Sequence, residues 1–494
     1  MSSLKNEIIS ATELWQVYEG CLAAHTSLAI DSDTERAYRF YEGDQWYGLE
    51  SSGEELPIYN FIAPVVRYKT SMVAMNNMSI NYSAPSADAR MQKVAAMLTG
   101  HALKKWESMQ MDRKCQDACK AAAIGGDSYV YFFDGDSGCQ LIDRTDIFFA
   151  DEGCADISAQ EYILIRERRA ARKIRELAMQ NGVGEEVAMT IMPDGEQDDD
   201  KCTCVLMLSL RNGDLHFQRF TKTVVCQPEQ VIKGLGIYPI ASLKCGERRG
   251  SARGVGEVLP LIANQIEINR NLARRLVNAK LTAYSRLVYA SDKIAEPSSL
   301  CEVGTAIEVE GGGISSIKDA VSYLTPSPMS PDAKSLSDEL LKVSKDLAGA
   351  GDAALGSINP TEASGAAIIA VRDQAALPLN EQTARFKQFA EDIARIWYRL
   401  WVVYNPAGMV LTDGGQITAD ELARLEPEVR IDISNSSPFS KYAREQALEK
   451  LFSMGHITFD EYVSSLDDDS SVPKSKLMQI IKNREGVNNG DNEN

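Results

Sequence analysis

This chain of 494 residues lacks an excess of positive charge, because it has 52 Lys and Arg against 70 Asp and Glu and a net charge of −18. A protein that coats nucleic acid needs a surplus of Lys and Arg, because the phosphates they neutralise release counterions. The acidic balance therefore argues against tight, sequence-reading DNA binding. With 44% hydrophobic and 25% charged residues, the composition is otherwise that of a globular protein long enough for several domains.

Long hydrophobic runs are also lacking. No stretch approaches the roughly 18 uninterrupted apolar residues that indicate a membrane-spanning helix. The N-terminal residues, MSSLKNEIIS, contain no basic stretch followed by an apolar run, which a signal peptide would need. These absences predict a protein without a membrane span that is made and kept in a cytoplasm.

Cysteine and histidine are sparse, with ten Cys and four His in the chain. Two close pairs, Cys115 with Cys119 and Cys202 with Cys204, have no second pair and no spaced histidines to complete the four ligands of a structural zinc site. We therefore predict that these thiols are buried as small hydrophobic groups, and that the protein holds no metal or cofactor.

Motifs of common enzymes are missing as well. The sequence contains no phosphate-binding G-x-x-x-x-G-K-S/T stretch and no G-x-S-x-G nucleophile turn. Gly234 with Gly236, and Gly254 with Gly256, lack the third glycine of a dinucleotide-binding loop and are interpreted as turns. Three consecutive aspartates at 198–200 lie in a polar stretch that indicates a solvated loop.

The sequence therefore does not predict an enzyme. A minor alternative is a metal-dependent nuclease that uses carboxylates such as Asp143, Asp146 and Asp151. The simpler interpretation is that these three side chains face solvent between strands.

The first half of the chain alternates helical and strand patterns, which predicts an α+β domain over residues 1–250. Asn212-Gly213 lies between two apolar runs and predicts a two-residue hairpin turn. Expected helices are 13–29, 89–109 and 168–179, and expected strands are 128–133, 140–143, 146–149, 161–166, 205–210 and 215–225.

After residue 250 the pattern predicts a projection built as helix, strands and helix. Apolar residues recur every three or four positions over 256–281, which indicates one long helix, with Arg270, Arg274 and Arg275 on its other faces. Residues 284–325 show short strands with glycine turns, and residues 332–347 indicate a returning helix after a proline cluster.

The remainder is predicted to be a loop followed by helices. Residues 348–364 are small, polar and glycine-rich. From 365 to 404 helical spacing continues through Trp397 and Trp401, and Pro378 should kink this helix. Further helices are expected at 441–454 and after two capping boxes, Thr418 with Glu421 and Thr458 with Glu461, whereas the last dozen residues should be disordered.

This order of elements over nearly the whole chain resembles that of the portal proteins of tailed bacteriophages. Local stretches agree with the resemblance. They are Tyr38 to Trp46 with Asn60 and Val65-Val66, Gly125 to Tyr129, and Gly254 to Glu257 with Asn264-Gln265 and Ile268-Asn269.

The resemblance implies a portal-like multidomain α+β fold with named parts. These are a wing (1–250), a stem (251–283 and 326–347), a β-rich clip (284–325), a tunnel loop (348–364), a long kinked helix (365–404), a helical crown (405–484) and a disordered tail (485–494).

The resemblance also implies a function. Such proteins form a ring, typically of about twelve subunits, at one capsid vertex. Double-stranded DNA passes through the ring during packaging and ejection without sequence-specific binding, and the tail attaches there. The implied partners are the terminase large subunit, a head-completion or adaptor protein, and the major capsid and scaffolding proteins. The protein would belong to the virion, after assembly in the host bacterial cytoplasm.

The resemblance also implies roles for specific residues. Trp397 and Trp401 should pack against neighbouring subunits. Arg270, Arg274 and Arg275 should form either inter-subunit salt bridges or a basic belt that touches passing phosphates. The tunnel loop should meet DNA through Asp352, Ser357, Asn359, Thr361 and Glu362. Alternatives are another virion connector or scaffold component, and a non-viral cytoplasmic assembly protein with a helical arm.

Overall fold

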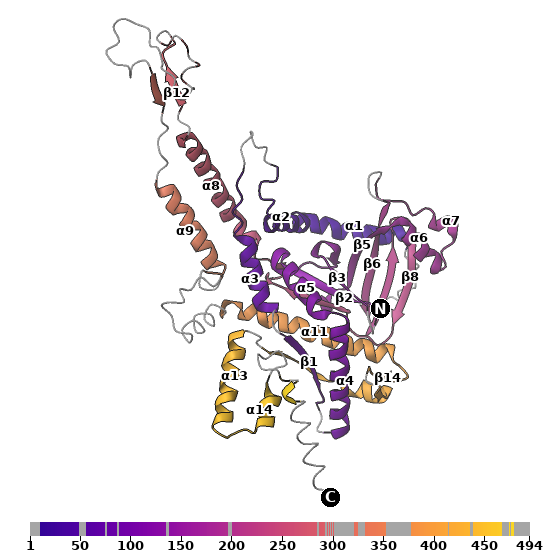
Figure 1. The fold of residues 1–494 in the computed structure, drawn as a ribbon. Helices are drawn as coiled ribbons and strands as arrows, with labels where there is room; N and C mark the ends of the chain where they lie inside the picture. Colours follow the sequence, from indigo (N-terminus) through magenta and orange to yellow (C-terminus); the bar gives the residue numbers. More distant parts are fainter. Residues whose placement is uncertain are drawn as a thin grey trace.

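The computed structural model has a body of mixed helix and sheet from which an arm of two helices projects (Figure 1). Two C-terminal helices, α13 (Pro438–Ser453) and α14 (Phe459–Ser465), lie at the other end of the body. The structure describes residues 10–48, 56–74, 77–85, 88–134, 138–195, 200–283, 286–291, 321–324, 331–351, 377–412, 414–434 and 438–466, and the single positions 294, 296, 298, 300, 474 and 476–478.

One unit of the body is an antiparallel sheet of five strands in the order β4-β5-β6-β7-β8. The turn between β6 and β7 contains Asn212 and Gly213, both with positive φ (54° and 85°), which confirms the predicted hairpin. The strands are β4 (Ile147–Phe149), β5 (Tyr162–Ala170), β6 (Lys201–Arg211), β7 (Asp214–Phe220) and β8 (Val225–Ile232).

Helices cover this sheet. Helix α1 (Ala11–Ser27) packs Leu14 and Tyr18 against Phe148 and Phe220, and α6 (Ala171–Gln180) with α7 (Glu185–Ala188) packs near one end of β6 and β8. The predicted helix 13–29 is therefore confirmed over 13–27. It ends at Ser27, and Ala29 adopts a left-handed conformation (φ 55°) before α2 (Ile30–Glu42) begins.

The main core surrounds helix α11 (Asn380–Tyr404). A three-stranded sheet, β3-β2-β9, packs beside α11, which also contacts the strand pair β1 and β16. These elements are β1 (Asn77–Ser83), β2 (Asp127–Phe132), β3 (Cys139–Ile142), β9 (Ile240–Lys244) and β16 (Glu428–Ser434), with α3 (Ile62–Ala74), α4 (Ala89–Ser108) and α5 (Met111–Gly125) alongside.

Trp397 and Trp401 lie in this core, with 3% and 1% of their surface exposed. The Trp401 ring lies 5.1 Å from the ring of His101, and the Trp397 ring lies 5.9 Å from that of Trp106. The prediction that these tryptophans pack against neighbouring subunits is wrong, because α3, α4 and the sheets of the same chain cover the helix.

The C-terminal region is only partly helical. Strand β16 pairs with β1 in antiparallel register, Ile431 opposite Ile80, so residues 428–434 belong to the main core rather than to a separate helical crown. Short strands β14 (Met409–Val410) and β15 (Gln416–Ile417) precede α12 (Ala419–Leu425). Both predicted capping boxes are confirmed, at α12 and α14.

The arm consists of α8 (Ile262–Ala283), a strand pair at the tip and α9 (Pro331–Leu347). The tip strands β12 (Arg286–Tyr289) and β13 (Val321–Leu324) are antiparallel, with Leu287 opposite Tyr323. Helix α8 begins later than predicted, because Leu259–Leu261 form a 3₁₀ turn around Pro260.

Two further sequence expectations need correction. Gly254 and Val255 form the short strand β11 (Gly254–Val255), paired with β10 (Gly246–Glu247), instead of a turn. Pro378 lies in the 3₁₀ turn Leu377–Leu379, and α11 begins after it at Asn380. Among the described residues, the proline therefore precedes the helix instead of kinking its interior, and residues 365–376 lie outside the described residues. Arg144–Asp146 and Ile157–Ala159 also form 3₁₀ turns.

Candidate functional site

The arm is the candidate site, because it is the part of the molecule that extends away from the core (Figure 1). The 22 residues of α8 span about 33 Å at about 1.5 Å per residue. The chain runs out along α8 and returns along α9. Near the body, Asn264 Nδ2 donates a hydrogen bond to Ser344 Oγ at 2.9 Å, and this bond joins the two helices.

Buried amides anchor the first half of α8 in the body. Gln265, which is fully buried, accepts a hydrogen bond from the Phe61 N–H and donates to the Tyr59 carbonyl. Asn269 accepts from the Tyr59 N–H and donates from Nδ2 to Gln45 Oε1 at 2.6 Å. Since unpaired amides are costly in a buried site, this arrangement fixes the direction in which the arm leaves the body.

The stretches quoted for the family resemblance meet at this root. Gln45 belongs to the stretch 38–46, and Asn60 Nδ2 donates to the Tyr41 carbonyl while its Oδ1 accepts from the Ala63 N–H at the start of α3. The sequence contains one signal of this anchor. Gln265 and Asn269 lie four residues apart, so both face the same side of the helix, which here is the buried side.

A second contact holds the segment just before α8. A Cβ atom at Gly254 would overlap the Gly126 carbonyl oxygen, so the backbone approaches closely only because both residues are glycine. The Gly254 N–H donates to Asp127 Oδ2 at 2.7 Å. Further along, Glu257 Oε2 lies 2.7 Å from Nζ of the buried Lys69. The resembling stretches 125–129 and 254–257 are thus in direct contact.

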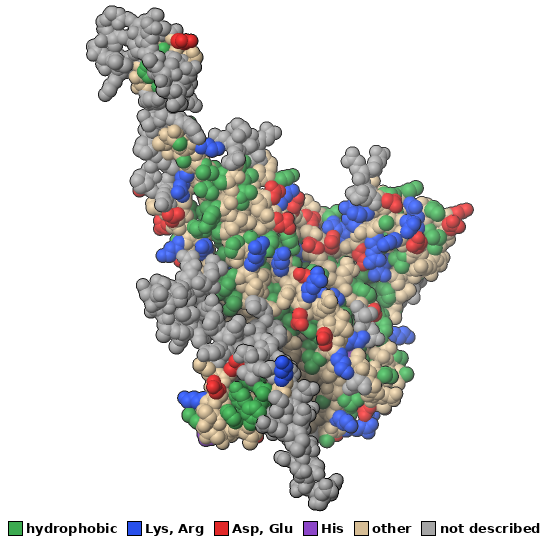
Figure 2. All heavy atoms as spheres, in the orientation of Figure 1, with side chains coloured by type: hydrophobic (Ala, Val, Ile, Leu, Met, Phe, Trp, Pro, Cys, Tyr) green, Lys and Arg blue, Asp and Glu red, His purple; other side chains and the backbone are tan. Residues whose placement is uncertain are grey.

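The arm exposes large apolar side chains. Figure 2 shows hydrophobic side chains along the arm and where it joins the body. On α8 Leu276 is 42% exposed, and on α9 Leu347 is 78% exposed. Other exposed members are Leu281, Val288, Tyr289, Leu336 and Val343. An exposed set of this kind on one projecting element is typical of a protein interface.

The three arginines of α8 differ in their contacts. Arg270 pairs with Glu267 at 2.8 Å on the same helix, and both side chains are about half exposed. Arg274 and Arg275 have no ion-pair partner among the described residues. The predicted inter-subunit bridges and the predicted basic belt therefore both stay predictions, with Arg274 and Arg275 as the available charges.

The predicted tunnel-loop residues lie outside the described residues. The structure describes 348–351 and resumes at 377, so Asp352, Ser357, Asn359, Thr361 and Glu362 are not placed. Their expected contact with DNA remains a prediction.

The three aspartates of the nuclease alternative each have a local structural role. Asp143 accepts from the Thr145 N–H, Asp146 pairs with Arg166 at 2.8 Å, and Asp151 accepts from the Gly153 N–H. Within the described part of the chain, no group of three or more His, Cys, Asp or Glu side chains could hold a metal ion.

The cysteine pairs are buried, as predicted. Cys115 and Cys119 lie on the inner side of α5, and Cys202 and Cys204 lie on β6. Burial raises the pKa of the Cys119 thiol to about 12, so this thiol stays protonated and unreactive near neutral pH.

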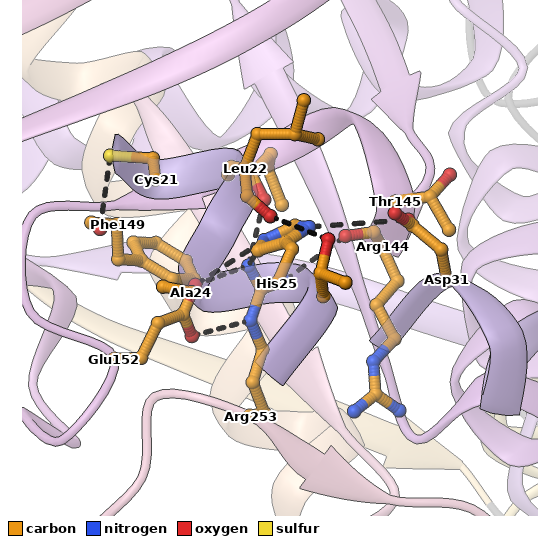
Figure 3. Close-up of polar contacts among 12 residues, drawn as sticks. Cys21, Leu22, Ala24, His25, Asp31, Arg144, Thr145, Phe149, Glu152 and Arg253 are labelled. Atoms are coloured by element: carbon orange, nitrogen blue, oxygen red, sulfur yellow. Dashed lines mark hydrogen bonds and ion pairs between the residues drawn. The ribbon is translucent and has the colours of Figure 1, made fainter. Parts of the chain in front are cut away.

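A buried charge cluster that the sequence did not reveal lies between α1 and the arm root (Figure 3). Arg253 holds Glu152 with two hydrogen bonds of 2.8 Å, and its Nη2 also lies 2.6 Å from His25 Nε2. Burial alone would raise the pKa of Glu152, but hydrogen bonds from Arg253 and His25 lower it to about 2. Burial lowers the pKa of His25, which lies stacked on Phe148.

No protein-family model matches this chain, and no curated protein matches it either. Among the described residues, no helix has both the length and the apolar character needed to cross a membrane.

Proposed function

We propose that this chain is the portal subunit of a tailed bacteriophage. Its copies would form a ring at a single capsid vertex, where DNA is packaged and later ejected and where the tail attaches. The observation that carries the proposal is the arm, which leaves the body in a fixed direction and exposes apolar side chains on both helices.

A ring would bury the apolar side chains that a single arm exposes. Full burial of a Leu or Val side chain contributes about 1.5–3 kcal/mol, and each subunit of a closed ring has a neighbour on either side. Leu276 and Leu281 on α8 and Val343 and Leu347 on α9 belong to different helices of the same arm. One neighbour would cover the first pair and the other neighbour the second.

The charge of the chain supports passage of DNA rather than capture. A net charge of −18 weakens phosphate binding over the whole subunit. Arg274 and Arg275 are the local exception on the arm, and they would either pair with a neighbouring subunit or touch the passing DNA. The motor would be a separate terminase, since the sequence has no phosphate-binding loop of its own.

The further partners follow from the same proposal. The tip around β12 and β13 would contact the terminase large subunit during packaging and a head-completion or adaptor protein afterwards. The body would contact the major capsid and scaffolding proteins. The protein would then be a component of the virion, assembled in the cytoplasm of a bacterial host.

A pair of matched variants tests the role of the arm in assembly. Leu281→Lys with Leu347→Lys places two charges on the exposed arm, whereas Met192→Lys with Val410→Lys makes the same change at exposed positions of the body. Size-exclusion chromatography with light scattering should give a ring mass for the control and a much smaller mass for the arm variant. Equal masses for the two variants would contradict an arm-mediated ring.

A second comparison separates the two expected roles of the arginines. Reversing Arg270, Arg274 and Arg275 to Glu should leave ring mass unchanged and lower DNA packaging if they form a belt around the DNA. Loss of the ring itself would instead assign them to inter-subunit salt bridges. Arg172→Glu and Lys173→Glu on α6 together with Lys222→Glu between β7 and β8 change the net charge equally and are the control.

A further inference from the structure

A cavity of about 410 Å³ lies where the N-terminus of α2 meets the segment that leads into α8. Four arginines line it, namely Arg144, Arg248, Arg249 and Arg253, although the chain as a whole is strongly acidic. A cavity of this volume is large enough for a small ligand.

Two of these arginines are buried at the floor of the cavity. Arg253 is 2% exposed, and Glu152 neutralises it through two hydrogen bonds. Arg144 is 9% exposed, donates from Nη1 to the Gly125 carbonyl, and forms an ion pair through Nε with Asp127 Oδ1 at 3.4 Å. Figure 3 shows the Arg144 guanidinium directed away from His25.

Arginines outnumber carboxylates at this cavity. Asp33 and Glu152 line it beside the four guanidinium groups, and Asp127 pairs with Arg144. Glu152 is held by Arg253, so the positive charge left over comes mainly from the remaining arginines.

Two exposed arginines at the edge of the cavity, here called the rim, add positive charge. Arg248 and Arg249 are exposed, and neither has an ion-pair partner among the described residues. They stand beside Gly250, whose positive φ of 63° turns the chain back toward Arg253. Paired guanidinium groups suit phosphate oxygens, because each presents parallel N–H donors.

We propose that this cavity binds a small phosphate monoester. The phosphate would lie between Arg144 and the pair Arg248 and Arg249. The organic part would lie against the apolar wall formed by Leu28, Val255 and Leu259. This site does not depend on ring assembly, because one chain supplies all its residues.

Isothermal titration calorimetry with AMP, adenosine, inorganic phosphate and a short DNA duplex tests the assignment on the full chain. AMP should bind, adenosine should not bind, and inorganic phosphate should bind more weakly than AMP. Equal affinity for AMP and inorganic phosphate, binding of adenosine, binding of the duplex but not of AMP, or no binding of AMP would each overturn the proposal.

Rim variants connect the binding to these residues. Arg248→Glu with Arg249→Glu should weaken AMP binding by at least about tenfold, which is the loss expected for one charge-assisted hydrogen bond. Arg172→Glu with Lys173→Glu changes the net charge equally on α6 and should keep wild-type affinity. Circular dichroism checks that both variants fold. Equal weakening of AMP binding in the two variants would show a general effect of net charge and would overturn the proposal.

Discussion

Asn269 on α8 donates a hydrogen bond from Nδ2 to Gln45 Oε1 at 2.6 Å, although 224 residues separate the two in sequence. Both side chains are buried, and Asn269 also accepts from the Tyr59 N–H and from Gln265 Nε2. The arm is therefore joined to the body by specific, directional bonds in addition to apolar contacts. This relationship gives each subunit of the proposed ring an arm with the same orientation.

Removal of this amide should loosen the arm root. Asn269→Ala leaves the Tyr59 N–H and Gln45 Oε1 unpaired in a buried site, so the free energy of unfolding should fall by about 1–3 kcal/mol. Lys280→Ala, at an exposed position of the same helix, should change it by less than about 0.5 kcal/mol. Urea denaturation followed by circular dichroism measures both, and equal values would show that the buried amides do not anchor the arm.

Locally encoded features could be predicted from the sequence. The Asn212-Gly213 turn, both capping boxes and the two arm helices depend on neighbouring residues or on a short apolar period. The missed features depend on distant partners. Strand β16 forms because β1 pairs with it, and its sequence EVRIDIS alone does not reveal that partner.

The close approach of Gly254 to Gly126 should tolerate no side chain. Gly254→Ala places a methyl group against the Gly126 carbonyl oxygen, and the overpacking should cost about 1–3 kcal/mol. Gly100→Ala is the matched control, because nothing lies within 4 Å of its Cβ position in α4. In thermal denaturation, the control should keep or raise the melting temperature, since Ala favours a helix over Gly. A wild-type melting temperature for Gly254→Ala would refute this packing.

Trp401 should stabilise the fold of the single chain. Trp401→Ala removes a fully buried ring from the main core and should lower stability by about 3–5 kcal/mol. Tyr404→Ala lies three residues further along α11 at a 44% exposed position and should have a much smaller effect. Wild-type stability of the Trp401→Ala chain would contradict the burial of this ring in the main core.

These tryptophans show why burial within a chain and burial between chains look alike in a sequence. The helical spacing of Trp397 and Trp401 indicates only that one face of the helix is covered. Whether a neighbour or the same chain covers it depends on α3, α4 and β9, whose positions no local pattern specifies. The charge cluster of His25, Glu152 and Arg253 was missed for the same reason, since its members come from three separate segments.

Acidification should destabilise the protein through His25. Burial lowers its pKa below the ordinary value of 6.5, so the folded chain favours the neutral ring and the unfolded chain binds the proton more readily. Stability is then fully present above about pH 6.5 and falls as the pH drops through the lower pKa of the folded state. Glu152, with a pKa of about 2, adds a further loss only from about pH 4.5 downward.

Melting temperatures at pH 7.5 and pH 5.5 measure the histidine effect. His25→Gln keeps an oxygen that can accept from Arg253 and should show a smaller decrease than the wild type. His456→Gln, at an exposed position, should keep the wild-type decrease. An identical decrease in the His25 variant would remove this histidine from the acid response.

The central claim is that copies of this chain close into a ring around a channel. Negative-stain electron microscopy of the purified full-length protein, with class averages along the ring axis, tests it most directly. We predict closed rings with a central hole, in which the arms of neighbouring subunits lie side by side. Compact monomers, or open chains of subunits without a hole, would contradict the proposed function.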